Sequence, residues 1–487
     1  MTLPTVSASA QTLRHLPTPA RPRLDPADVE VPDGYDVEVV LAGLSMPTGM
    51  AFADDGTLFL IEGGSTWPPR PYLPARILRY APRGGDPRGG DPAGDLAVFG
   101  EEPPERPRGA TVHGGYLYVA DKGDYHSSIV RYGLSTGERT VVVDGLPDSG
   151  WHEPGGPVFG PDGLMYFAQG SVSRNGVVLP QDYGADLARH PAAHDAPGQD
   201  VVLTGDNVDT YDVTAQYPYP VETGAFKPFG VPANRTERVA GARKCSTGVW
   251  RAQPDGTGME LLAWGVRNPY GMAFGEDGEL YVSDNGFAEA GERAVANDPD
   301  RIWRIRNART EPGSVRTPDW YGFPDICADG RPVWEQRHLP QRGRPARRLI
   351  AEPPAWAGPP AYVELPHSGM ANMDVCRSDL FGHRGRLFAC EWGSLAPLTS
   401  PRSQDVDHGF RVIGVDVAKG TAGDFLRNRH PGPASAHGTG GIERPVDCAF
   451  SPDGRSLYVL DFGVSHVDGG RHVSYGHTGV LWRITRR

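Results

Sequence analysis

Cysteine, long apolar runs and basic stripes are all scarce in this chain, and each absence excludes a class of protein. The five cysteines among the 487 residues form no C-x-x-C pair, so no zinc or redox motif is indicated, and at most one or two disulfides are possible. No run approaches about eighteen apolar residues, the length that spans a membrane. The formal net charge is −12 and the Lys and Arg residues form no stripe, which argues against a nucleic-acid partner.

The N-terminal segment lacks the apolar core of a secretory signal. Its first thirty residues are polar and rich in proline. As written, the chain shows no export signal, which is typical of a cytoplasmic protein. The sequence alone does not assign the compartment. We expect residues 1–33 to form a flexible or surface-lying arm, and residues 34–487 to form one domain whose first strand begins at Tyr35.

One short phrase returns six times along the chain and predicts the fold. Each copy is an apolar segment, a glycine turn and a second apolar segment ending in a polar residue, as in PTGMAFADDGTLFLIEG from Pro47. Asp-Gly and Gly-Gly turns tolerate positive φ and join two strands into a hairpin. Repeated units that close into a ring leave no long free edges. The sequence therefore predicts an all-β, six-bladed β-propeller. The six turn glycines are Gly56, Gly115, Gly163, Gly278, Gly385 and Gly454.

The spacing around the turn glycines points to one face of this ring. Eleven residues before Gly163 is His152, and eleven before Gly278 is Arg267. Both positions precede the first strand of a hairpin, so they lie at the end opposite the turn, together with the polar residues that end the second strands. Ligand sites favour concave places with converging polar groups, and one channel mouth is therefore the candidate site. The residues that end the second strands are Glu62, Asp121, Gln169, Asp284, Glu391 and Asp461. The acids among them either bind backbone donors or hold a cation.

Two long insertions interrupt the repeat. They cover roughly residues 171–246 and 308–366, and they fall between blades or on blade edges. Long ordered loops over a rigid scaffold usually shape binding. The insertions either wall the channel mouth or decorate the outer rim, and the sequence does not decide between these two placements.

Three segments carry a resemblance to a known family. They are WHEPGGPVFGPDGLMYFAQG from Trp151, GVRNPYGMAFGEDGELYVSDNG from Gly265, and WYGFPD from Trp320. In this order they resemble the soluble quinoprotein glucose dehydrogenases and the wider glucose/sorbosone dehydrogenase family. The resemblance implies a six-bladed propeller that binds pyrroloquinoline quinone (PQQ) and calcium at one channel mouth and oxidises sugars.

The resemblance also implies roles for single residues. His152 is similar to the general base, for which an imidazole with a near-neutral pKa is suited. Arg267 is similar to the arginine that binds the quinone carbonyls and stabilises negative charge there. Three further sets follow from the matching positions. Asn268 and Arg444 resemble cofactor contacts, the backbone carbonyls of Gly286 and Phe287 resemble calcium ligands, and Asp300 resembles an acid near that ion.

The chain departs from the family at three positive or acidic positions. Trp151 stands where the family has an acid, Val446 where it has a second arginine, and the segment GSLAP at 393–397 has no lysine. Lys122, Arg377 or Arg402 then compensates for the missing positive charges, or the cofactor differs, or there is none.

Several assignments stay open on the residues alone. His367 and Asn372 either face the channel or do not, and the aromatic residues of WYGFPD either stack on a ligand or pack in the core. The leading function is oxidation of a sugar or related polyol or aldehyde with PQQ, calcium and an external electron acceptor. The alternatives are a cofactor-free metal-binding lactonase, hydrolase or lyase, and a non-catalytic binding propeller.

Overall fold

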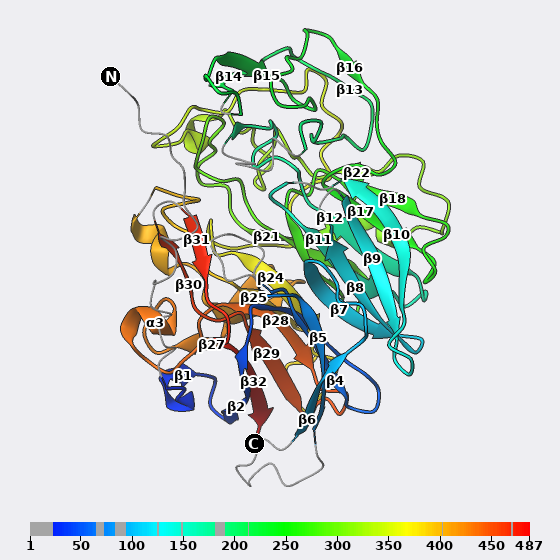
Figure 1. Cartoon of the computed structure of the whole chain (residues 1–487), viewed down its shortest axis with the longest axis vertical. Helices are drawn as coiled ribbons and strands as arrows, with labels where there is room; N and C mark the ends of the chain where they lie inside the picture. The colour runs from blue at the N-terminus through cyan, green and yellow to red at the C-terminus, as the bar shows by residue number, and fades with distance from the viewer. Residues whose placement is uncertain are drawn as a thin grey trace.

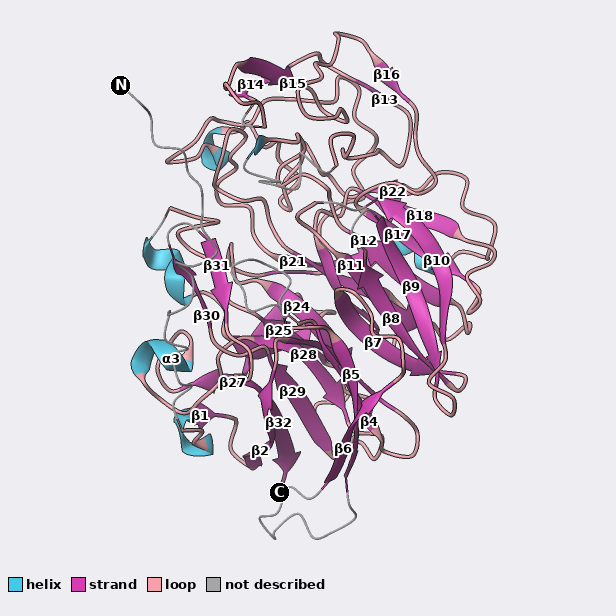
Figure 2. Ribbon diagram, viewed as in Figure 1, coloured by secondary structure: helices cyan, strands magenta, loops and turns pink. Residues whose placement is uncertain are grey.

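The protein is described here from a computed structural model. The structure describes residues 23–64, 73–82, 94–123, 126–147, 150–180, 190–212, 214–401, 403–468 and 471–487. Strands dominate the described chain, and its helices are short (Figure 2). The helices are η1 (Pro26–Asp28), η2 (Arg306–Arg309), η3 (Gln336–His338), η4 (Ser403–Asp407) and α3 (Ala434–His437).

Six antiparallel sheets form the blades of the expected propeller (Figure 1). Blades 1 and 2 take consecutive strands from the innermost outwards. Blade 1 consists of β3 (Pro47–Phe52), β4 (Leu58–Glu62), β5 (Arg76–Pro82) and β6 (Gly94–Phe99). Blade 2 consists of β7 (Pro107–His113), β8 (Tyr116–Lys122), β9 (His126–Gly133) and β10 (Arg139–Pro147).

Blades 3 and 4 carry the two insertions. Blade 3 consists of β11 (Pro154–Phe159), β12 (Met165–Gln169), β17 (Gly248–Ala252) and β18 (Glu260–Trp264), with β22 (Asp319–Trp320) added in parallel. Blade 4 consists of β19 (Pro269–Phe274), β20 (Leu280–Asp284), β21 (Arg301–Ile305) and β23 (Tyr362–Val363). The second insertion thus supplies outer strands to both blades.

Blades 5 and 6 receive strands from the N-terminal part of the chain. Blade 5 consists of β24 (Met370–Val375), β25 (Leu387–Glu391), β26 (Arg411–Asp416) and β27 (Thr421–Asn428), with β1 (Val29–Glu30) at its edge. Blade 6 consists of β28 (Pro445–Phe450), β29 (Ser456–Asp461), β32 (Gly479–Arg486) and β2 (Tyr35–Leu44). Because β2 precedes blade 1 in sequence and completes blade 6, it closes the ring.

The predicted turns are confirmed. Each turn glycine connects the innermost strand of a blade to its second strand, and all six have φ between 67° and 84°. Side chains larger than hydrogen are strained at such φ values, which explains glycine there. The innermost strands also share a register shift near their first residues, the matching point of all six repeats.

The apolar core lies between neighbouring blades. Leu117 and Val119 of blade 2 pack with Phe59 and Ile61 of blade 1, and similar clusters join the other neighbours around the ring. The cluster between blades 2 and 3 also takes residues of both insertions. No blade therefore buries its faces alone.

The first insertion carries two small two-stranded sheets. They pair β13 (Val201–Val202) with β16 (Arg238–Val239), and β14 (Val208–Tyr211) with β15 (Pro220–Thr223), of which β14–β15 is a hairpin. They gather at one end of the long axis of the molecule, beyond the blades (Figure 1). A second hairpin, β30 (Ser465–Asp468) with β31 (Arg471–Ser474), interrupts blade 6. None of the described helices is long and apolar enough to cross a membrane.

Candidate functional site at the channel mouth

Four of the acids that end the second strands clamp the loops that enter the innermost strands. Asp121 accepts the backbone N–H groups of Glu105 and Arg106, and Asp461 accepts those of Glu443 and Arg444. Glu62 and Asp284 do the same for their own blades. The structural interpretation is therefore confirmed for these four acids, whereas Glu391 accepts a hydrogen bond from Nε of Arg411 at 2.7 Å. Among the residues that the structure describes, no group of three or more His, Cys, Asp or Glu side chains is arranged to hold a metal ion.

His152 lies in such a loop, directly before β11, and is 9% exposed. Its Nδ1 is 2.7 Å from Oγ of Ser171 and 3.2 Å from the carbonyl oxygen of Ser171. Burial, with the positive charges of Arg267 and Lys122, lowers the pKa of His152 well below its ordinary value. The imidazole is therefore neutral near pH 7, which is the form that accepts a proton.

Arg267 lies directly before β19 and is 5% exposed. Its Nε donates to the carbonyl of Arg174 at 2.8 Å, and its Nη1 donates to the carbonyl of Gly286 at 2.7 Å. No described carboxylate forms an ion pair with it, and burial lowers its pKa to about 10. Arg267 is thus a buried cation whose hydrogen bonds go to neutral backbone carbonyl groups.

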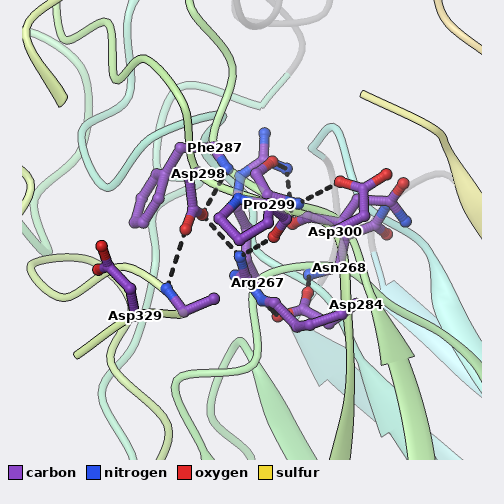
Figure 3. A network of polar contacts seen from close by, with 12 residues as sticks. Arg267, Asn268, Asp284, Phe287, Asp298, Pro299, Asp300 and Asp329 are labelled. Carbon is purple, nitrogen blue, oxygen red and sulfur yellow. Dashed lines mark hydrogen bonds and ion pairs between the residues drawn. The ribbon is translucent and has the colours of Figure 1, made fainter. Parts of the chain in front are cut away.

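The segment predicted to hold calcium is the loop that follows β20. Its Gly286 N–H donates to Asp300 at 2.8 Å, and its Phe287 N–H donates to Asp298 at 2.9 Å. Asp300 also accepts the N–H of Gly369, and burial raises its pKa to about 6. Figure 3 shows these groups in one network with Arg267. The predicted ligands are brought together, but the Gly286 carbonyl already accepts a hydrogen bond from Arg267.

The remaining predicted cofactor contacts lie at the same mouth. Arg444 is 4% exposed, and its guanidinium donates to the backbone carbonyls of residues 392–394 and 465. It stacks on Trp392 at 4.1 Å, and burial lowers its pKa to about 9. Asn268 is half-buried, with its backbone N–H donated to Asp284 at 2.7 Å.

Several residues of the mouth were not singled out from the sequence. Arg108 on β7 forms an ion pair with Glu153 and donates to the hydroxyl of Tyr270 at 2.7 Å. Trp392 follows β25, and its ring lies 5.2 Å from that of His472. Glu153 directly follows His152, and Tyr270 lies three residues after Arg267. This closeness in sequence to predicted site residues could have placed both at the mouth. His472 comes from the β30–β31 hairpin, which nothing in the repeat predicts.

The first insertion walls the mouth. Ser171 binds the ring and the backbone N–H of His152, Val172 accepts the N–H of Trp151, and the carbonyl of Arg174 binds Arg267. Asn175 donates to the carbonyls of Ala288 and Arg293 in the loop of blade 4. Arg293 in turn forms an ion pair with Asp325 of the second insertion, at 2.8 Å. Both insertions are therefore tied to the loop that carries Gly286.

Other predictions have mixed outcomes. Lys122 is at the mouth and donates to the carbonyl of Gly150, whereas Arg377 binds the carbonyl of Phe274 near the turn face, so Arg377 cannot supply the missing charge. Arg402 lies outside the described residues. The core interpretation of WYGFPD is confirmed, because Trp320 and Tyr321 are 1% and 3% exposed.

Asn372 and His367 are the last two residues that the sequence left open. The Asn372 amide donates to the carbonyl of Thr48 across the innermost strands at 3.4 Å. Burial, and to a smaller extent the charge of Arg267, lowers the pKa of His367 to about 4. All five cysteines are buried and free.

Comparisons with known proteins bear on the fold. No family model and no curated protein matches the chain. Among solved structures, it is similar to the PQQ domain of pyranose dehydrogenase from Coprinopsis cinerea, with 16% identity, 96% of this chain and 98% of that chain covered, and a TM-score of 0.55.

Two more structures have a comparable likeness. A calcium structure of a Trichoderma reesei enzyme of carbohydrate-active family AA12 has 14% identity, covers 96% of this chain and 99% of its own, and has a TM-score of 0.54. A Thermus thermophilus structure described as an oxidoreductase (glucose dehydrogenase) has 18% identity, covers 93% of this chain and 100% of its own, and has a TM-score of 0.51. At these identities the likeness shows a shared fold, and the propeller implied by the family resemblance is confirmed.

Proposed function

We propose that the protein oxidises a sugar or a related polyol or aldehyde at the channel mouth, with PQQ as cofactor and an external electron acceptor. One observation carries the proposal: a neutral buried histidine, His152, and a buried arginine without a carboxylate partner, Arg267, lie at the same mouth. The similarity to structures that contain PQQ domains supports it.

The positive groups at the mouth fit an anionic cofactor. Arg267 and Arg444 are both buried, both donate only to backbone carbonyls within the described chain, and both have lowered pKa values. Lys122 is also buried at this mouth, where it donates to the carbonyl of Gly150. For the two arginines, burial without a carboxylate partner is costly, and an anionic ligand offsets that cost with charge-assisted hydrogen bonds. These three groups would hold the carboxylates and carbonyls of PQQ.

The fit to calcium is poorer. Calcium takes six to eight oxygen ligands, and Gly286 and Phe287 would contribute backbone carbonyls. The Gly286 carbonyl is 2.7 Å from Nη1 of Arg267, so a calcium ion there would meet a guanidinium charge. We therefore include calcium in the proposal only with a movement of Arg267 away from this carbonyl, onto the cofactor.

The chemistry of the site follows from the protonation states of its side chains. His152 accepts the proton of the substrate hydroxyl, which a neutral imidazole does and an imidazolium does not. Arg267 and Arg444 would bind and orient the negative charge of the cofactor. The first insertion excludes water from the loop that carries His152. When bound, PQQ would supply the acceptor for the hydride.

Cofactor binding is tested by titrating the protein with PQQ, with and without calcium, and following the quinone absorbance. Stoichiometric binding is expected, and Arg267→Ala should weaken it by about 10- to 100-fold, the value of one or two charge-assisted hydrogen bonds. Arg309→Ala is the matched control, because Arg309 forms an exposed ion pair far from the mouth. An unperturbed quinone spectrum with protein in excess rules PQQ out.

Catalysis is tested with a dye-linked assay over sugars, aldehydes and lactones. His152→Ala should reduce oxidation by about 10²–10⁴-fold, the contribution of a positioned base. His437→Ala on α3, an exposed histidine, is the control. Lactone hydrolysis without PQQ would instead assign a cofactor-free hydrolase to the same mouth.

A further inference from the structure

Ser171, at the start of the first insertion, contacts the proposed base. It is the second residue after Gln169, which ends β12, and it is fully buried. Its Oγ is 2.7 Å from Nδ1 of His152 and 2.7 Å from the carbonyl oxygen of Ser173. This hydroxyl is therefore shared by an imidazole nitrogen and a backbone carbonyl.

The positions of the hydrogen atoms follow from this arrangement. A carbonyl oxygen only accepts, so the single hydroxyl hydrogen of Ser171 is donated to Ser173. The same Oγ then accepts from Nδ1 of His152, and the carbonyl of Ser171, at 3.2 Å from Nδ1, also requires a donor there. The neutral ring consequently carries its proton on Nδ1. Its Nε2 keeps a lone pair and makes no hydrogen bond to the described part of the protein.

Asp195 fixes the segment that presents this hydroxyl. Its carboxylate accepts the N–H of Val172 at 2.7 Å, the N–H of Ser173 at 3.1 Å and the hydroxyl of Ser173. Asp195 belongs to the first insertion and is 2% exposed. The carboxylate thus acts on the backbone of the segment, while the group that touches the imidazole is a neutral hydroxyl.

We propose that Ser171 is a positioning residue for His152, which keeps the proton on Nδ1 and leaves Nε2 to accept the proton of the substrate. The inference rests on the proposed function for the identity of the reaction, but the tautomer itself does not depend on it. The hydroxyl also leaves the ring without a negative partner, so the ring is a weak base.

The charges around the imidazole act in the same direction. Arg267 faces it from the loop before β19, Lys122 from the end of β8, and Arg174 from the first insertion. All three disfavour the imidazolium, and burial adds to their effect. Gln169, the residue that clamps the loop of His152, is neutral as well. A carboxylate at position 171 would be the first negative group on the ring.

The wild-type protein tests the tautomer directly. The ¹⁵N resonances of the His152 ring are measured above its pKa, with a His152→Gln sample for assignment. The proposal requires Nδ1 to be protonated and Nε2 unprotonated. The reverse pattern, or an equal mixture, would overturn it.

A pair of nearly isosteric variants tests the effect of charge. Ser171→Asp places a carboxylate on Nδ1 and should raise the His152 pKa by about one to three pH units, the usual effect of an adjacent opposite charge. Ser171→Asn offers a neutral acceptor of the same size and should leave that pKa near the wild-type value. The pKa is read from ring NMR titrations without substrate, and folding is checked by thermal unfolding. Equal pKa values in both variants contradict the proposal.

Activity separates this inference from the proposed function. Protonated His152 is inactive, so the rate falls as pH drops through its pKa, and in Ser171→Asp this fall should come at a pH higher by the same amount as the NMR shift. If the NMR shift occurs and no variant oxidises any sugar, the proposed function is wrong and the positioning role stands. If oxidation occurs but its pH profile ignores the NMR shift, Ser171 does not act through the catalytic base.

Discussion

Blades 3 and 4 hold their mouth loops in opposite ways. In blade 4, Asp284 at the end of β20 accepts the backbone N–H of Asn268 at 2.7 Å. In blade 3, the equivalent residue at the end of β12 is Gln169, whose Nε2 donates to the carbonyl of His152 at 3.1 Å. One loop is held through its amide by a charged group, and the other through its carbonyl by a neutral one.

The difference matches what each loop carries. Arg267 lies in the loop that is clamped by an acid, and the charges of Asp284 and Asp298 favour its protonated form. His152 has only cations as charged neighbours of note, together with neutral partners, and it stays uncharged. The same position of the repeat therefore supports a permanent cation in one blade and a neutral base in the next. The repeat thus keeps a clamping residue at the end of the second strand, and the charge of that residue differs between the two blades.

Removing the clamp of blade 4 should have the largest effect on stability. Asp284 accepts hydrogen bonds from Nε of Arg301 at 3.0 Å and Nε1 of Trp303 at 2.9 Å, as well as from Asn268, and it is fully buried. Asp284→Ala leaves these donors without an acceptor and should cost about 3–5 kcal/mol. Urea unfolding measures the loss. Glu279→Ala, which breaks an exposed ion pair, is the control and should cost under about 0.5 kcal/mol.

Changing blade 3 to the charge of blade 4 should have an intermediate effect. Gln169→Glu turns a donor towards the His152 and Gly170 carbonyls into an acceptor and should destabilise the protein by about 1–3 kcal/mol. Its negative charge should also raise the pKa of His152.

The pH dependence of that variant gives a check on its cause. A buried Glu facing two carbonyls has a folded-state pKa above its unfolded value, so the folded state binds the proton more tightly. The loss of stability should therefore be largest above the folded-state pKa and shrink as pH falls through that pKa towards the unfolded value. A loss that does not change with pH would mean that the clamp in blade 3 does not act through the charge of residue 169.

The architecture was predictable because it depends on local chemistry that repeats. Turn glycines with positive φ, and polar residues at fixed offsets from them, led from the sequence to six blades and to one face for His152 and Arg267. The closure of blade 6 by β2 was not predicted, since its partner β32 lies at the other end of the chain.

The site was predictable only in part, for a related reason. His152 and Arg267 have the same place in the repeat, and Arg444 was placed by the family resemblance, whereas Ser171 and Asp195 act through contacts of an insertion that has no repeat to compare. The calcium ligands were inferred from the family resemblance, because backbone carbonyl groups carry no side-chain signal. Their sequence position gave no hint that Arg267 binds the Gly286 carbonyl.

The turn face should show the smallest effect and no difference between the two blades. Gly163 and Gly278 have φ values of 75° and 76°, and a Cβ atom at either position would meet no atom within 4 Å. The cost of Gly163→Ala and Gly278→Ala is then the strain of positive φ alone, about 1 kcal/mol each. Thermal or urea unfolding should give equal losses within error. Unequal losses would show that blades 3 and 4 already differ at their turns, and the contrast between their mouths would then reflect blade stability and not the charge of the clamp.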